Sequence, residues 1–204
     1  MADKEKFFVK EVYCQIAAHF DNTRHYKWRW ISDFIENTPL YSLILDMGCG
    51  NGRNLEYSRN MIGIDNCTEF VTICKNKGLN VLESDIVSTP FTTASFNYII
   101  NIAVFHHLEN EFRRKKCLNE MYRLLKPNGK ILISVWSKNQ PKKTKKVFKN
   151  YGDNYVDWNK DNKIYKRYYY IFEIEEIKKL FEESGFKIEN YIWDCGNEIF
   201  TLSK

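Results

Sequence analysis

The chain lacks several features that would set it apart from an ordinary soluble protein. No apolar run approaches the roughly 20 residues that span a bilayer, and residues 1–6 carry acids where a secretory signal needs an apolar core. No internal repeat or low-complexity tract marks a second domain. We therefore expect one domain, residues 1–204, in the cytoplasm, with the nucleus as an alternative.

Patterns typical of metal sites are also missing. The sequence has six cysteines but no Cys-x-x-Cys pair, and no pair of histidines lies near them. Scattered thiols in apolar surroundings are typical of a reducing, intracellular compartment. We predict no metal site. The cysteines are Cys14, Cys49, Cys67, Cys74, Cys117 and Cys195.

Positive charge is concentrated in one segment. The net charge is +5, but residues 138–167 hold nine lysines and one arginine against three aspartates, a local net charge of +7. Aromatic residues are interleaved with these lysines. Such a segment either binds a phosphate-rich partner or forms a solvated loop, and the sequence leaves both open.

Apolar segments typical of strands alternate with segments of helical periodicity. We predict strands at 43–46, 61–64, 80–83, 96–102, 130–136, 186–193 and 199–203. We predict helices at 5–20, 28–35, 54–59, 69–77, 111–125 and 173–184. This order predicts an α/β fold with a seven-stranded, mostly parallel sheet, an antiparallel C-terminal hairpin and helices on both faces. Residues 1–38 would form a helical cap, and residues 138–167 a basic insertion.

A glycine-rich turn follows the first predicted strand. Residues 46–52 read Asp-Met-Gly-Cys-Gly-Asn-Gly, and the next strand ends at Asp65, where a parallel α/β sheet holds a ribose. The glycine spacing differs from the dinucleotide fingerprint, because the third glycine comes two residues after the second. The pattern resembles motif I of the class I S-adenosylmethionine (SAM) methyltransferases, which have a Rossmann-like fold.

That resemblance implies a set of cofactor contacts. The glycine turn would lie against the methionine part of SAM, Asp46 would help hold its amino-acid end, and Asp65 would accept from the ribose hydroxyls. Asp85 would accept from the adenine amine, with Ile86 beside the ring. Taken singly, Asp46 and Asp85 are equally compatible with turn caps, and Asp65 with a surface acid. The full set is Asp46, Gly48, Cys49, Gly50, Gly52, Asp65, Asp85, Ile86 and Ile102.

Longer stretches resemble the eukaryotic tRNA wobble-uridine carboxymethyl methyltransferases. The matching segments are 12–24, 46–52, 102–108, 133–136, 155–158 and 166–172, so the likeness covers nearly the whole chain. It implies SAM-dependent esterification of the carboxylate of 5-carboxymethyluridine at position 34 of tRNA. The segment between Trp136 and Arg167 is shorter than in many relatives.

The resemblance also implies the residues of the acceptor site. The catalytic candidates are Arg24, His106 and Trp136. The substrate-binding candidates are Tyr13, Lys142, Lys143, Lys145, Lys146, Arg167 and Tyr168. For each aromatic residue alone, core packing is an alternative, and His107 is equally compatible with a buried structural role.

The implied chemistry needs no general base. A carboxylic acid has a pKa of about 4, so the nucleophile is already an anion at neutral pH. The site must orient one carboxylate oxygen and exclude water, and Arg24 is our candidate for holding the other oxygen.

The resemblance implies two partners, tRNA and a small zinc-binding activator protein. The activator would bind the sheet edge at 80–83 and the helix at 69–77, where Phe70, Val71 and Ile73 exceed the apolar positions that one buried face needs. Two other functions stay open: a small-molecule methyltransferase of the quinone or lipid-precursor type, and a catalytically silent SAM-binding scaffold in a tRNA-modification complex.

Overall fold

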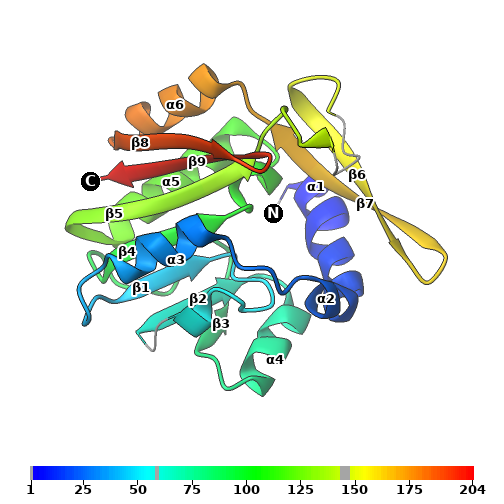
Figure 1. The fold of residues 1–204 in the computed structure, drawn as a ribbon, viewed down its shortest axis with the longest axis horizontal. Helices are drawn as coiled ribbons and strands as arrows, with labels where there is room; N and C mark the ends of the chain where they lie inside the picture. The colour runs from blue at the N-terminus through cyan, green and yellow to red at the C-terminus, as the bar shows by residue number, and fades with distance from the viewer. Residues whose placement is uncertain (1, 58–59, 143–147) are drawn as a thin grey trace.

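The computed structural model describes residues 2–57, 60–142 and 148–204, and a seven-stranded sheet forms its centre (Figure 1). The strand order is β3-β2-β1-β4-β5-β9-β8. The first five strands in that order are parallel to one another, and β9 runs antiparallel to both of its neighbours, β5 and β8. The predicted fold class is therefore confirmed. The strands are β1 (Ile44–Met47), β2 (Met61–Asp65), β3 (Val81–Glu83), β4 (Phe96–Ile102), β5 (Leu125–Trp136), β8 (Lys187–Asp194) and β9 (Asn197–Ser203).

Helices cover both faces of this sheet because successive strand residues point to opposite sides. Leu45 and Ile99 pack toward α5 (Glu111–Leu124) and α6 (Ile174–Glu183). Ile44 and Ile100 pack toward α3 (Arg29–Glu36) and α4 (Thr68–Asn76). None of the helices in the described part of the chain is long and apolar enough to cross a membrane.

The N-terminal segment forms a helical arm beside the sheet (Figure 1). It consists of α1 (Asp3–Glu5), a π-helix η1 (Lys6–Lys10) and α2 (Glu11–Thr23), where the periodicity predicted one helix over 5–20. A π-helix is rare and is frequently found at functional sites.

The basic insertion contains a feature that the sequence analysis missed. β6 (Gly152–Lys160) and β7 (Lys163–Ile171) pair into a separate two-stranded ribbon beside the N-terminal arm (Figure 1). Asp161 and Asn162 have φ of 50° and 58°, the left-handed conformation of a two-residue hairpin turn. The Asp-Asn pair between two aromatic-rich segments was the available signal.

One other local prediction was wrong, and one strand is longer than predicted. The helix predicted at 54–59 is a short 3₁₀ turn, η2 (Leu55–Tyr57), and residues 58–59 lie outside the described part. β5 begins at Leu125, five residues before the predicted strand at 130–136, with a register irregularity against β4. Asn128 in this first part of β5 has a φ of 63°.

Candidate functional site

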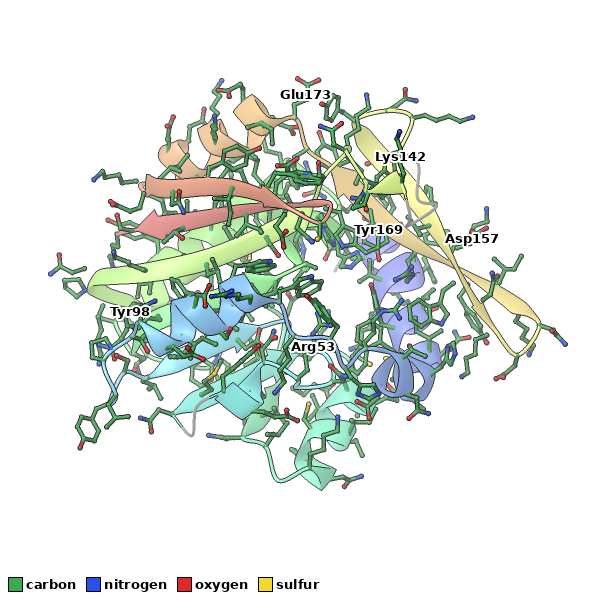
Figure 2. The ribbon with its side chains drawn as sticks, viewed as in Figure 1. Arg53, Tyr98, Lys142, Asp157, Tyr169 and Glu173 are labelled. Atoms are coloured by element: carbon green, nitrogen blue, oxygen red, sulfur yellow. The ribbon has the colours of Figure 1, made fainter. Side chains whose placement is uncertain are left out.

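A cavity of about 310 Å³ opens at the carboxyl ends of the parallel strands. Its lining comes from the turn after β1, the ends of β2 and β4, and the N-terminal arm. β7 and the turn between β8 and β9 complete it. Arg53, after β1, and Tyr169, on β7, lie on two sides of this region (Figure 2).

The glycine turn makes room at one end of the cavity. A Cβ atom on Gly50 would meet nothing closer than Phe20 at 4.0 Å, so this backbone is open to a ligand. On Gly48 and Gly52 it would collide with Val104 and Leu79, each at 2.5 Å. Gly48, Cys49 and Gly50 line the cavity, whereas Gly52 is buried beneath it and supports the turn.

Asp65 is fixed at the end of β2. Its two carboxylate oxygens accept from the backbone N–H groups of Gly50 and Cys67, both at 2.9 Å. Burial raises the pKa of Asp65, and the two N–H bonds oppose that rise. The carboxylate keeps lone pairs for further donors, which fits the hydroxyls of a ribose.

A polar corner is formed by Asp46 and Asn54, which flank the glycine turn in the sequence. Asp46 is fully buried, and its Oδ2 accepts from Asn54 Nδ2 at 3.4 Å. Asp46 Oδ1 and Asn54 Oδ1 have no hydrogen-bond partner among the described residues, and burial raises the pKa of Asp46 to about 7. Asn54 lines the cavity and Asp46 does not. Acceptor oxygens of this kind fit an ammonium group.

Arg53 supplies the complementary charge next to that corner. Its guanidinium lies 4.4 Å from the centre of the Trp28 ring and donates to the Tyr26 carbonyl at 3.3 Å. It has no ion pair within the described residues and lines the cavity, so it fits a carboxylate. Together with Asp46 and Asn54 it matches the amino-acid end of SAM. Sequence reasoning missed Arg53 and Asn54, although they directly follow the glycine turn.

Asp85 and Ile86 line the cavity after β3, as the resemblance implies. Asp85 Oδ1 accepts from the Val87 N–H at 3.2 Å, and Oδ2 from Arg113 Nη2 at 2.9 Å. Ile102, at the end of β4, also lines the cavity.

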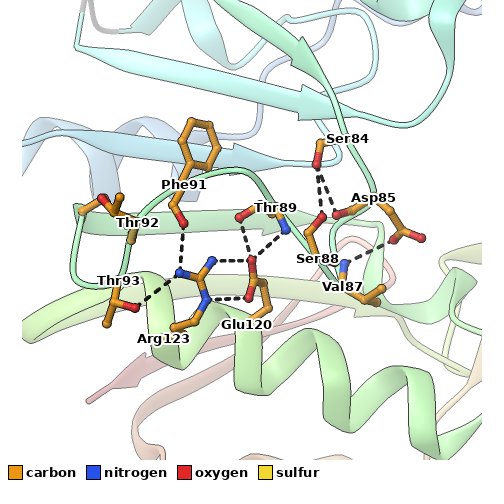
Figure 3. A network of polar contacts seen from close by, with 11 residues as sticks. Ser84, Asp85, Val87, Ser88, Thr89, Phe91, Thr92, Thr93, Glu120 and Arg123 are labelled. Carbon is orange, nitrogen blue, oxygen red and sulfur yellow. Dashed lines mark hydrogen bonds and ion pairs between the residues drawn. The ribbon is translucent and has the colours of Figure 1, made fainter.

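The loop after Asp85 is tied to α5 by a polar network (Figure 3). Glu120 accepts from the Thr89 N–H at 2.8 Å and from Arg123, which donates in turn to the Phe91 carbonyl at 2.9 Å. Burial alone would raise the pKa of Glu120, but hydrogen bonds from Arg123 and Thr89 hold this pKa at about 2. This network fixes the loop that carries Asp85 and Ile86.

Two further guanidinium groups, those of Arg24 and Arg167, line the cavity. Arg167 on β7 is 5% exposed, and its Cζ lies 4.7 Å from the centre of the Trp158 ring. Its Nη1 donates weakly to the Tyr13 hydroxyl at 3.5 Å, and its Nε has no hydrogen-bond partner among the described residues. Arg24, at the end of α2, lies 4.6 Å from the same indole. Neither has an ion pair within the described part, and both line the cavity.

The histidines are held by backbone groups. His106 is fully buried and its Nδ1 accepts from the Trp136 N–H at 2.9 Å, so the neutral ring carries its proton on Nε2. His107 Nδ1 lies 2.6 Å from the Tyr168 carbonyl, and its Nε2 lies 3.1 Å from the Tyr13 hydroxyl. Burial lowers the pKa of His107 to about 3, so it is neutral at physiological pH.

One predicted substrate contact was wrong by one residue. Tyr168 does not line the cavity; it is fully buried and its hydroxyl donates to Asp153 at 2.7 Å. Tyr169 lines the cavity instead, on the same side of β7 as Arg167, because strand residues alternate in direction. Its ring stacks on Trp136.

The remaining predicted positions lie elsewhere. Lys142 is exposed and lies outside the cavity lining, and Lys143, Lys145 and Lys146 fall outside the described residues. The fold also brings Cys14, Cys67 and Glu69 together, with possible ligand atoms within 4.8 Å of one another. Burial raises the pKa of Cys14 to about 11.

Comparison with known proteins identifies the family of the chain. Residues 45–133 match the methyltransferase domain family. A tRNA (carboxymethyluridine(34)-5-O)-methyltransferase of Schizosaccharomyces pombe is 34% identical, over 95% of this chain and 94% of that protein. One of Arabidopsis thaliana is 44% identical over 67% of this chain, which spans only 34% of the relative's length.

A solved structure that contains the Haloferax volcanii Trm112 methyltransferase activator has a chain of the same fold. The TM-score is 0.65 at 15% identity, covering 94% of this chain and 96% of that one.

Proposed function

Because the chain belongs to the tRNA (carboxymethyluridine(34)-5-O)-methyltransferase family, we propose that it methylates the carboxylate of 5-carboxymethyluridine at position 34 of tRNA. The observation that carries this proposal is the acceptor end of the cavity. Arg24 and Arg167 bring two guanidinium groups there without a carboxylate partner among the described residues. Arg167 is 5% exposed, and a buried cation without an anion is costly, so the site is suited to an anionic acceptor.

SAM would be held in the same cavity, on the side of the glycine turn. Asp46 and Asn54 would bind its ammonium group, Arg53 its carboxylate and Asp65 its ribose. When bound, SAM supplies an electrophilic methyl group. The glycine turn leaves the backbone of Gly50 open for this ligand.

The chain's own residues would orient the acceptor rather than deprotonate it. Arg167, which donates to the Tyr13 hydroxyl, would also donate to one oxygen of the substrate carboxylate. Arg24 would donate to the same carboxylate. His107 is neutral and engaged on both ring nitrogens, so it is unsuited to acid–base work. The histidines fix the wall formed by Trp136 and Tyr169, which excludes water from the reacting oxygen.

Mass spectrometry of wobble nucleosides tests this function. The protein would be incubated with SAM, the activator and tRNA carrying 5-carboxymethyluridine, and the expected product is an alkali-labile methyl ester at position 34. Methylation of small apolar acceptors without RNA would favour a small-molecule enzyme. SAM binding without turnover on any tRNA would favour a scaffold.

The partner proposal rests on the sheet edge. β3 lies at the edge of the sheet, and Leu82 on it is 41% exposed. The Haloferax structure with the Trm112 activator supports a partner of this kind for the fold. Helix α4 offers less exposed apolar surface to a partner than its sequence predicted, because Phe70 and Val71 are buried within the chain's own core. We place the activator on β3, where an exposed strand edge accepts an added strand.

A further inference from the structure

The N-terminal arm is joined to the cofactor end of the cavity by three charged side chains. Glu5, the last residue of α1, is 5% exposed. Its carboxylate accepts from Arg113 Nε at 3.0 Å and from Nη2 at 2.7 Å. The same Nη2 reaches Asp85 Oδ2 at 2.9 Å, and all three residues line the cavity.

Arg113 donates more hydrogen bonds to Glu5 than to Asp85. A guanidinium pairs most strongly with a carboxylate through two parallel N–H groups. Glu5 occupies that bidentate face of Arg113, since Nε also donates to Oε1 at 3.2 Å while Nη2 donates to Oε2, and Asp85 receives a single hydrogen bond from Arg113. Asp85 therefore stays close to a positive charge while it keeps lone pairs on the cavity side.

We propose that Glu5 is a positioning residue for adenine recognition. This inference rests on the proposed SAM site, in which Asp85 accepts from the exocyclic amine. Without the charge of Glu5, Arg113 would turn its bidentate face to Asp85 and occupy the lone pairs that the amine needs. Glu5 thus controls the selectivity of the site for adenine without touching the reacting atoms.

The position of Glu5 also couples the arm to the cofactor. The Glu109 N–H donates to Glu5 at 2.9 Å, and the Lys4 N–H donates to the Glu109 carboxylate at 2.8 Å. Val9 and Lys10 of the π-helix line the cavity. Because coupling between two binding events is reciprocal, a ligand that needs a correctly placed Asp85 must strengthen the docking of the arm.

The test compares two ligands that differ at one position of the base. S-adenosylhomocysteine carries the exocyclic amine, whereas S-inosylhomocysteine carries a carbonyl there that repels Asp85. Measured by calorimetry, Glu5→Gln should lower the affinity for S-adenosylhomocysteine about tenfold and the affinity for S-inosylhomocysteine less than about twofold. Hydrogen exchange in residues 2–13 should slow on binding of S-adenosylhomocysteine to the wild type, and clearly less in Glu5→Gln.

The matched control is Asp153→Asn, the same carboxylate-to-amide change at a second ion pair that holds the N-terminal arm. Asp153 pairs with Lys4, lies on β6, and has no hydrogen bond to Asp85 or Arg113 within the described part of the chain. We expect this variant to leave the preference between the two ligands unchanged. Glu5→Asp, which keeps the charge, should recover part of the preference and remains informative if Glu5→Gln is unstable.

A double-mutant cycle with Asp85→Asn separates positioning from general loosening. Positioning predicts that Glu5→Gln has no further effect on affinity once Asp85 is replaced. An equal loss for both ligands, persisting in the Asp85→Asn background, would overturn the inference while leaving the proposed function intact. Failure of the wild type to bind S-adenosylhomocysteine would overturn both.

Discussion

Arg24 and Arg167 both lie against the Trp158 ring, with their Cζ atoms 4.6 Å and 4.7 Å from its centre. Burial together with the charge of Arg167 lowers the pKa of Arg24. Burial also acts to lower the pKa of Arg167, but Tyr169 and Tyr13 outweigh this effect and raise it. Because burial raises the pKa of Tyr169, this tyrosine is uncharged at neutral pH. Arg167 is then a buried cation without an ion pair among the described residues, which costs stability at the proposed acceptor site.

Replacing Arg167 with Met should stabilise the ligand-free protein. The substitution removes a buried charge that has no ion pair in the described part and keeps an apolar side chain against Trp158. We expect the free energy of unfolding to rise by about 1 kcal/mol or more, with loss of methyl transfer. Urea denaturation of the two proteins measures this, and a decrease in stability would mean that Arg167 is a structural cation.

Replacing either arginine with Lys should separate orientation from attraction. Lysine keeps the charge but loses the planar fork. With carboxymethylated tRNA we expect kcat to fall about 100-fold for Arg167→Lys, which corresponds to about 2.7 kcal/mol, and less for the more exposed Arg24→Lys. Affinity for S-adenosylhomocysteine, measured by calorimetry, should stay within about twofold. A parallel loss of cofactor binding would assign these arginines to SAM.

His107 predicts a pH dependence of stability with a definite sign. Burial lowers its pKa to about 3, so between its unfolded pKa of about 6.5 and pH 3 only the unfolded chain binds the proton. Stability must therefore fall as the pH falls through this window. Asp46, with its pKa raised to about 7, contributes the opposite slope above its unfolded pKa of about 3.9.

Comparison of the wild type with His107→Gln isolates the histidine contribution. Denaturation curves from pH 7 to pH 4 should show a shallower loss of stability in the variant, by up to about 1.4 kcal/mol per pH unit. Identical slopes would mean that His107 is protonated in the folded protein. At saturating SAM, turnover of the wild type should stay flat from neutral to mildly alkaline pH, since no general base titrating near pH 7 is invoked. The titration of Asp46 would change the affinity for SAM instead.

Charge reversal at Lys142, Lys143, Lys145 and Lys146 should weaken tRNA binding. Each lost phosphate contact lowers the slope of log affinity against log salt by about one. Affinity for S-adenosylhomocysteine should not change. The matched control reverses Lys163 and Lys166, which are exposed on the ribbon. If neither affinity nor salt slope responds, the basic run is a solvated segment.

Leu82→Glu should abolish binding of the activator without unfolding the protein. Leu82 is 41% exposed on the edge strand, so a charge is tolerated in the free chain but is costly at an apolar interface. Co-purification tests the loss of activator binding, and a thermal melt tests that the variant remains folded. The matched change Ile164→Glu, on the exposed part of the ribbon, should leave co-purification intact.

The sheet and its cofactor end follow closely from the sequence because the signals there are local. An apolar strand, a glycine turn and an acid after the next strand are read within about twenty residues. Asp65 and Asp85 lie where such a pattern predicts. Arg53 and Asn54 were missed because the motif was read as ending at Gly52.

The acceptor end depended on contacts distant in sequence. Arg24 and Arg167 meet at Trp158 only because the ribbon packs against α2. The choice between Tyr168 and Tyr169 depended on strand alternation, which could not be applied while this segment was treated as an insertion. The link from Glu5 through Arg113 to Asp85 joins three remote segments, and no local pattern signals it.

Among the described residues the ribbon of β6 and β7 has no strand pairing with the main sheet, yet it carries Arg167 and Tyr169. Two residues of the proposed acceptor site therefore stand on a different piece of hydrogen-bonded structure from the proposed SAM site. We expect that an exchange of residues 152–171 for a different hairpin would alter what is methylated while the SAM site stays in place. In this proposal one part of the acceptor site comes from a continuous, exchangeable stretch of chain, whereas Arg24 and Trp136 come from the end of α2 and from β5.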